Sequence, residues 1–280
     1  MRSNAYEPRN WSSLRRQGGP DRFVLLLLDA WLKRAVLEVQ EYVHMCMAAF
    51  RAMVTPPVYR YDMVEQLDVI GVQSLTVVLL TGFFTGAVLA LQSGLTLDQF
   101  GARPVVGRLV SASMIKELGP VLTGLMLTGR VGSGIAAELG SMVVTDQINA
   151  LRALGTDPVR KLVVPRLLAG FFMAPILTVV SDFIGIFGGW VVARFTLQVN
   201  TGVYWSSVTK ALYMQDVWMG LVKPFVFGFL IVTIACHVGL RTAGGTAGVG
   251  KATTVAVVAG SVAVIAADFF VGQVLISLLY

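Results

Sequence analysis

The chain has 280 residues, of which 55% are hydrophobic and only 14% charged, and its mean hydropathy is +0.73. Soluble domains carry about 25% charged residues, so this composition excludes an ordinary soluble protein and indicates an all-α integral membrane protein. The formal net charge of +6 does not indicate nucleic-acid binding, because the basic residues recur between apolar runs and do not gather in one patch.

The N-terminal part of the chain is predicted to lie outside the bilayer core. Residues 1–20 are polar, and we expect them to form a flexible tail. In the following region, residues 21–60, the stretch Asp21–Met53 has its charged side chains on one half of the helical wheel and apolar ones mostly on the other. This pattern predicts an amphipathic helix in the membrane interface, with a helix packed on the bundle as the alternative. Pro56 and Pro57 would end it.

Five apolar stretches follow within residues 61–280, each long enough to cross a hydrocarbon core of about 30 Å. The predicted spans are Val69–Leu91, Ser111–Val144, Leu167–Ala193, Val217–Leu240 and Thr253–Leu279. The first contains Gly82 and Gly86 at the GxxxG spacing of closely packed membrane helices. The second and third spans could instead pair as one kinked hairpin, which would change the span count.

The distribution of basic residues predicts the orientation in the membrane. Fifteen Lys and Arg residues lie before the first span and in the loops after the second and fourth spans, against four in the other two loops. Cytoplasmic segments carry the excess of Lys and Arg. We therefore expect a multi-pass protein with a cytoplasmic N-terminus and a C-terminus, at Tyr280, on the periplasmic side.

Charged residues inside the predicted spans are candidates for a functional site, because placing a charge in hydrocarbon is costly. These residues are Lys116, Glu117, Arg130, Glu138, Asp182, Lys223 and Asp268. Glu138 follows Arg130 by eight residues, too far for direct contact along one helix, so each is expected to pair with another helix. The charges could form structural salt bridges, or they could line a polar patch in an apolar cavity that touches a lipid headgroup.

Two motifs resemble active sites but lack required residues. Gly245–Ala252 approaches a P-loop, yet Ala252 stands where a hydroxyl must hold Mg²⁺, so we expect a flexible cytoplasmic turn without a nucleotide site. Ser133 with His237 as its base could suggest an intramembrane hydrolase, but Val131 departs from the GxSG motif of rhomboid-type proteases. We expect this chain to have no catalytic residues, metal or cofactor of its own. A secondary transporter that relays protons through the acidic residues of the spans is the main alternative.

The segment Thr145–Arg166 is predicted to place a short helix at the cytoplasmic face. Thr145 or Asp146 can cap this helix, Gly155 can end it, and Asp157 with Pro158 can start the next one. Its apolar residues at i, i+3 and i+6 are Ile148, Leu151 and Leu154. An apolar ridge on a short helix is typical of a docking element for a soluble partner, although a simple amphipathic connector would show the same pattern.

Several short motifs occur in order between Val69 and Phe270. They are Lys116-Glu117-Leu118-Gly119-Pro120, Gly129-Arg130-Val131-Gly132-Ser133, Ala137-Glu138-Leu139-Gly140, Asp157-Pro158 with Pro165-Arg166, Gly188-Gly189, Lys251-Ala252-Thr253-Thr254 and Asp268-Phe269. This ordered set resembles the MlaE/YrbE family, the permeases of ABC-type lipid transporters that work with MCE-domain proteins.

The resemblance implies an inner-membrane permease homodimer that handles phospholipid or a related lipid. It also implies two ABC ATPase subunits, which would bind ATP and Mg²⁺, and MCE-domain proteins on the far side. The polar cavity positions would be Glu117, Lys223 and Asp268, with Lys116 and Lys251 as neighbouring basic positions. Coupling to the ATPase would involve Asp146, Ile148, Leu151, Leu154 and Asp157. Helix bending would be supplied by Pro120, Gly129, Gly132 and Gly134.

Overall fold

A computed structural model describes residues 20–54 and 59–279, and all regular elements in these ranges are helices. This confirms the all-α class. The predicted tail lies almost wholly outside the described residues, as do Pro56 and Pro57. Helix α2 (Pro20–Val54) confirms the helix predicted over Asp21–Met53, while its place at a membrane interface stays a prediction. The chain divides into two compact units between Met47 and Ala48, within α2 and ahead of the predicted boundary at residue 60.

Five helical segments of the described chain are long and apolar enough to cross a membrane, which confirms the predicted number. Arg60–Asp98 comprises α3 (Arg60–Ile70), η1 (Val72–Ser74) and α4 (Leu75–Asp98). Arg103–Val144 comprises η2 (Arg103–Val105), α5 (Val106–Ser113), η3 (Met114–Leu118), α6 (Gly119–Leu127), η4 (Thr128–Gly132) and α7 (Ser133–Val144). The remaining three are η5 (Val159–Val163) with α9 (Val164–Phe195), then α11 (Met214–Leu240) and α12 (Gly245–Leu279). The second and third are thus separate spans rather than one kinked hairpin.

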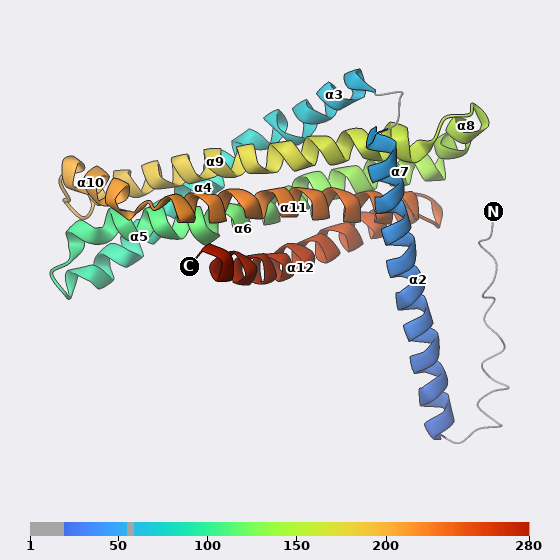
Figure 1. Cartoon of the computed structure of the whole chain (residues 1–280), viewed down its shortest axis with the longest axis horizontal. Coiled ribbons are helices and arrows are strands. Elements are labelled where there is room, and N and C mark those ends of the chain that lie inside the picture. The colour runs from blue at the N-terminus through green and yellow to red at the C-terminus, as the bar shows by residue number, and fades with distance from the viewer. Residues whose placement is uncertain (1–19, 55–58, 280) are drawn as a thin grey trace. The chain divides into compact units, whose positions relative to one another are not determined.

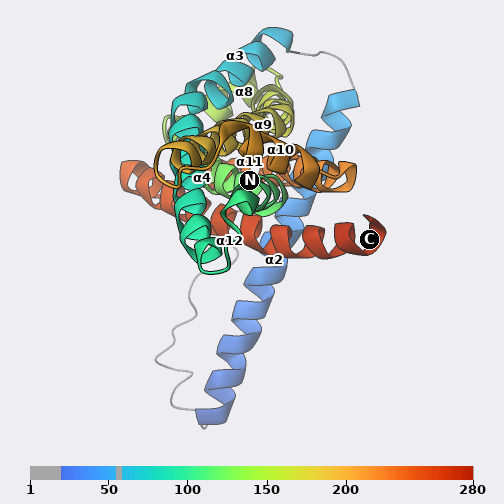
Figure 2. The same ribbon diagram turned by 90° about the vertical axis from the view of Figure 1, so that its left-hand side faces the viewer.

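Two short helices mark opposite ends of the unit that begins at Ala48. Helix α8 (Gln147–Ala153) joins the second and third spans at one end, and α10 (Thr201–Ala211) joins the third and fourth spans at the other (Figure 1). We refer to these as the α8 end and the α10 end. Figure 2 views this unit from the α10 end and shows that α12 runs obliquely across the other spans.

Glycines allow α4 and α9 to pack backbone against backbone. A Cβ atom added to Gly86 would overlap the carbonyl of Gly185, and one added to Gly188 would overlap the carbonyl of Phe83. A Cβ atom on Gly82 would lie 2.8 Å from the carbonyl oxygen of Ser181. Only glycine permits this approach, so the close helix contact predicted from the GxxxG spacing is confirmed.

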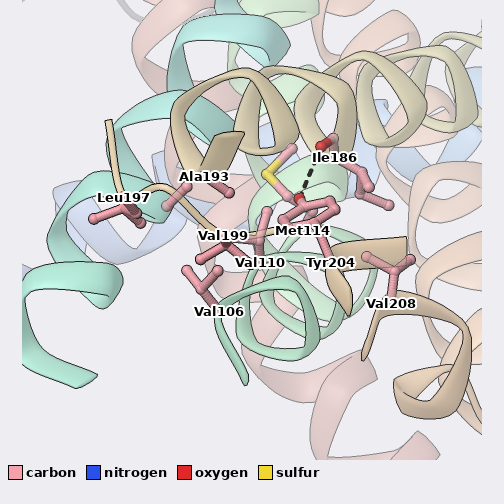
Figure 3. Close-up of a cluster of buried hydrophobic side chains, with 10 residues drawn as sticks. Val106, Val110, Met114, Ile186, Ala193, Leu197, Val199, Tyr204 and Val208 are labelled. Carbon is pink, nitrogen blue, oxygen red and sulfur yellow. Dashed lines mark hydrogen bonds between the residues drawn. The ribbon is translucent and has the colours of Figure 1, made fainter. Parts of the chain in front are cut away.

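A buried apolar cluster fixes α10 against the spans at the α10 end. Tyr204 is fully buried, and its hydroxyl donates a hydrogen bond to the carbonyl of Ile186 at 2.9 Å (Figure 3). Burial raises the pKa of Tyr204, so the phenol keeps its proton and remains a donor. Met114 and Val110 of the second span pack in the same cluster. The cluster therefore connects the second and third spans through α10.

Arg130 and Glu138 each pair with a different span, as predicted. The guanidinium of Arg130 donates to Ser74 Oγ at 2.6 Å and to the carbonyl of Val69 at 3.2 Å, beside the break between α3 and α4. Glu138 accepts from Arg166 of α9 at 2.6 Å, and only 4% of the Arg166 side chain is exposed. Each of these charges therefore connects two spans, which is the structural role considered from the sequence.

Candidate functional site

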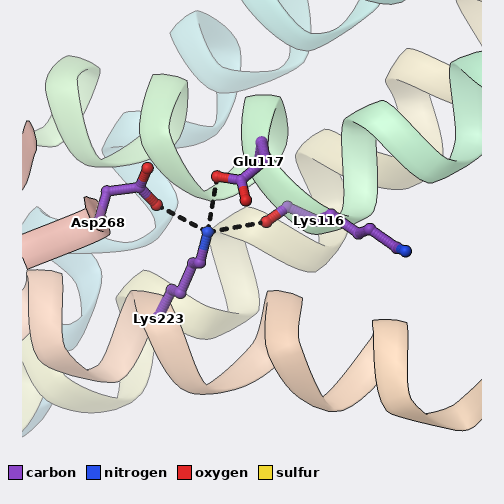
Figure 4. A network of polar contacts seen from close by, with 4 residues as sticks. All are labelled: Lys116, Glu117, Lys223 and Asp268. Atoms are coloured by element: carbon purple, nitrogen blue, oxygen red, sulfur yellow. Dashed lines mark hydrogen bonds and ion pairs between the residues drawn. The ribbon is translucent and has the colours of Figure 1, made fainter. Parts of the chain in front are cut away.

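Three of the predicted polar residues meet at Lys223, whose side chain is completely buried. Its ammonium donates to Glu117 Oε2 at 2.6 Å and to the carbonyl of Lys116 at 3.1 Å (Figure 4). It also forms an ion pair with Asp268 Oδ1 at 2.9 Å. Two of these contacts are hydrogen bonds, whereas the contact with Asp268 is an ion pair without hydrogen-bond geometry. We call this group the Lys223 cluster, and it joins the second, fourth and fifth spans.

The sequence around Pro120 explains how a backbone carbonyl enters the cluster. A proline has no N–H, so Pro120 cannot donate to the carbonyl of Lys116, four residues before it. The preceding segment η3 is a π-helix, in which the N–H of Gly119 bonds to the carbonyl of Met114. The carbonyl of Lys116 therefore lacks its usual helical donor and accepts from Lys223 instead. Pro120, predicted as a bend, thus also shapes the site.

The accessible charge of the Lys223 cluster is negative. It holds two carboxylates and one ammonium, and the side chain of Glu117 is 49% exposed while that of Lys223 is 0% exposed. A ligand that approaches this chain would therefore meet the carboxylate of Glu117 before the ammonium. Such a surface favours a hydrogen-bond donor or a cationic group over an isolated phosphate.

Lys116 contributes its carbonyl to the cluster but not its side chain, which points away (Figure 4). The Lys116 ammonium pairs with Asp216 at 2.7 Å, and 2% of the Asp216 side chain is exposed. The predicted fourth span begins at Val217, one residue after Asp216, so Asp216 is not among the predicted site residues. A signal for it exists, because Asp216 lies in the first turn of α11 and seven residues before Lys223, on the same helix face.

Lys251 is not brought to the Lys223 cluster. It is exposed near the start of α12 and precedes Asp268 by seventeen residues, which is about 25 Å along a helix. The flexible turn expected over Gly245–Ala252 is wrong, because these residues already belong to α12. The glycines of Gly245–Ala252 lower the helix propensity without forbidding a helix, so the long apolar helix that follows can begin at Gly245.

Helix α8 confirms the short helix predicted after the second span, but its start differs from the expected cap. Asp146 occupies the N-cap position with φ +58°, and its carboxylate accepts from the side chain of Asn149 at 2.9 Å instead of from a backbone N–H. Gly155, at φ +75°, follows its C-terminal end as predicted. Asp157 starts the next helix by accepting from the backbone N–H of Val159 at 3.0 Å.

The three apolar residues of the predicted ridge, two in α8 and Leu154 at its C-cap, differ in exposure. Ile148 is buried, Leu151 is partly exposed and Leu154 is 80% exposed. Ile148 therefore anchors the helix to this chain, while Leu154 presents a large apolar side chain at the α8 end. Among the predicted coupling residues, Leu154 leaves the most apolar surface for a partner to cover.

The glycines expected to bend the second span lie around its second π segment. Gly129 and Gly132 are in η4, and Gly134 is in the first turn of α7. Ser133, the serine considered as a nucleophile, donates its hydroxyl to the carbonyl of Gly129 at 2.5 Å and to that of Arg130 at 3.2 Å. These bonds to its own helix are those of an ordinary helical serine.

Comparisons with known proteins match a family and several individual relatives. The family described as Permease MlaE matches residues 63–274, which include the Lys223 cluster and α8. A probable ABC transporter permease protein of Rickettsia conorii is 43% identical over 226 residues, covering 81% of this chain and 87% of the relative. A protein with the same description from Synechocystis is 38% identical over 247 residues, covering 87% and 91%. The intermembrane phospholipid transport system permease protein MlaE of Haemophilus influenzae is 36% identical over 230 residues, covering 81% and 88%.

Proposed function

We propose, because this chain belongs to the MlaE permease family, that it is the inner-membrane subunit of an ATP-driven transporter that moves phospholipid or a related lipid between membranes. It is a transport subunit rather than an enzyme. ATP would be hydrolysed by two copies of a separate ATPase, two copies of this chain would form the permease, and an MCE-domain protein would receive or deliver the lipid. The N-terminus would be cytoplasmic, which places the α8 end on that side.

The observation that carries this proposal is the Lys223 cluster within five mainly apolar spans. A structural salt bridge needs no surplus charge, yet the cluster has a surplus carboxylate, and the half-exposed residue is Glu117. Charged residues inside membrane-spanning helices are usually functional. Glu117 is placed to accept from the donor groups of a lipid headgroup, while Lys223, which also pairs with Asp268, holds it in position.

A Glu117→Gln variant should test the role of the accessible carboxylate in lipid transfer. We expect the rate of lipid transfer by the reconstituted complex to fall about tenfold, because the charge-assisted hydrogen bond is lost. Thermal unfolding of the same variant in detergent should change much less, since the amide oxygen that replaces the carboxylate can still accept from Lys223. Normal transfer by this variant would show that the cluster is structural.

Transfer that continues without ATP but stops with an uncoupler would favour the ion-driven alternative.

The docking of the ATPase can be tested at α8. Replacing Leu154 with Asp should abolish co-purification of the ATPase, because a charge would replace the most exposed of the three apolar side chains of the ridge. Membrane insertion should be unchanged, as Leu154 contacts little of this chain. The matched control is Leu154→Met, which keeps an apolar side chain of similar volume and should retain the ATPase. Association that survives Leu154→Asp would place the docking site elsewhere.

A further inference from the structure

A separate cavity of about 360 Å³ lies between η3, α9, α10 and α11 toward the α10 end. We call it the α10 cavity. Its walls are mainly aliphatic and aromatic, with Ile186, Val208, Leu212 and Leu221 among them. It shares no lining residue with the Lys223 cluster, and its volume is within the range of small-ligand sites, about 300–1,000 Å³.

Two residues that line the cavity are also exposed on the surface of the third and fourth spans. Phe183 at its edge is 74% exposed, and Val217 is 40% exposed. In a membrane-spanning helix, exposed side chains of this kind meet hydrocarbon. A ligand would therefore enter from the lipid phase, and it must be predominantly apolar.

Asp182 is the one ionisable residue among those that line the cavity, where Thr209 is also polar. It lies inside the third span, only 9% of it is exposed, and it lines the α10 cavity. Its Oδ1 atom is buried and has no hydrogen-bond partner within the residues that the structure describes. This oxygen is packed directly on Gly119, where a Cβ atom would overlap it. Oδ1 is closed off by Gly119, and no hydrogen bond is found for the other carboxyl oxygen, Oδ2, among the described residues. A carboxyl group this deeply buried without a partner is rare and costly, so a donor in the cavity would be expected at Oδ2.

A neutral donor suits this place better than a charged one. Moving an ammonium group from water into hydrocarbon costs much free energy, because its charge loses its hydration. A hydroxyl group carries no charge, so its desolvation costs less. An alkyl chain would fill the space between the apolar walls, and a hydroxyl group on this chain would donate a hydrogen bond to the carboxyl group of Asp182.

We propose that the α10 cavity binds a long-chain lipid that carries a free hydroxyl group, with the hydroxyl donating to Asp182 and the chain packed against α9, α10 and α11. The site is separate from the Lys223 cluster and requires neither ATP nor a partner protein. Its failure would therefore leave the proposed transport function untouched.

The test compares hexadecanol with hexadecyl fluoride, which has a similar size but no donor. Binding of each radiolabelled probe is measured to the full chain in nanodiscs. The wild type should bind the alcohol about tenfold more tightly than the fluoride, a factor that corresponds to about 1.4 kcal/mol. Asp182→Leu should lower the affinity for the alcohol to that for the fluoride, while the affinity for the fluoride is kept. Retained binding of the fluoride shows that the cavity is intact, which a misfolded variant would not show.

A second pair of variants locates the bound probe. Val217→Trp should fill the mouth of the cavity and remove the binding of both probes. Val88→Trp is its control, because Val88 of α4 is 50% exposed and does not line the cavity. The proposal is overturned if the wild type does not distinguish the two probes, if the preference persists in Asp182→Leu, or if Val217→Trp still binds the alcohol.

Discussion

Replacing Lys223 with methionine should lower the free energy of unfolding by about 3–5 kcal/mol, because it leaves two carboxylates without their counter-ion. Lys223 is fully buried and is shared by Glu117 and Asp268, at 2.6 and 2.9 Å. Removing the ammonium leaves these two carboxylates together in surroundings of low dielectric constant, where their repulsion is strong. The same change should also abolish lipid transfer, since the second, fourth and fifth spans lose their common connection.

Equilibrium unfolding in mixed detergent micelles would measure this loss. Adding Glu117→Gln and Asp268→Asn to the Lys223→Met variant should restore part of the stability, because the unpaired carboxylates are then removed. The control is Arg103→Met, which breaks a pair with Asp98 whose side chains are 44% and 45% exposed and should cost about 0–1 kcal/mol. A Lys223→Met variant as stable as this control would mean that water reaches the cluster freely.

Replacing Gly86 with leucine should cost at least about 3 kcal/mol of stability, the upper part of the range for overpacked cores. A side chain at this position would meet the carbonyl of Gly185, which is backbone and cannot turn away. Helices α4 and α9 would have to separate along their length, so the contacts at Gly82 and Gly188 would weaken as well. The variant should therefore unfold at a lower denaturant concentration and lose transfer activity.

Gly134→Ala provides the matched control within a helix. No atom of the described chain lies within 4 Å of the Cβ that this change adds, apart from the helix's own backbone and the neighbouring residues. Alanine stabilises a helix interior by about 0.5–1 kcal/mol over glycine, so the variant should be equally or slightly more stable. If Gly86→Leu behaved like Gly134→Ala, the close packing of α4 on α9 would be wrong.

The spans and much of the site could be predicted because hydrocarbon imposes strong local rules. A helix that crosses it needs about 20 apolar residues, so the five spans are visible as largely apolar runs. The same rule makes Glu117, Lys223 and Asp268 conspicuous as charges within those runs. Their meeting at one point was implied by resemblance to a family, since nothing in the spacing of residues 117, 223 and 268 shows that they touch.

The sequence by itself determined the helical class, the number of spans, the short helix α8 and the glycine face of the first span. Each of these depends on composition or on a period within one segment. Only the tertiary structure decided which charged side chains form ion pairs. Asp216 pairs with Lys116, and Arg166 pairs with Glu138. One oxygen of Asp182 has no hydrogen-bond partner among the described residues. The physical reason is that such pairs depend on the depth and rotation of different helices, and these are set by packing between segments far apart in the chain.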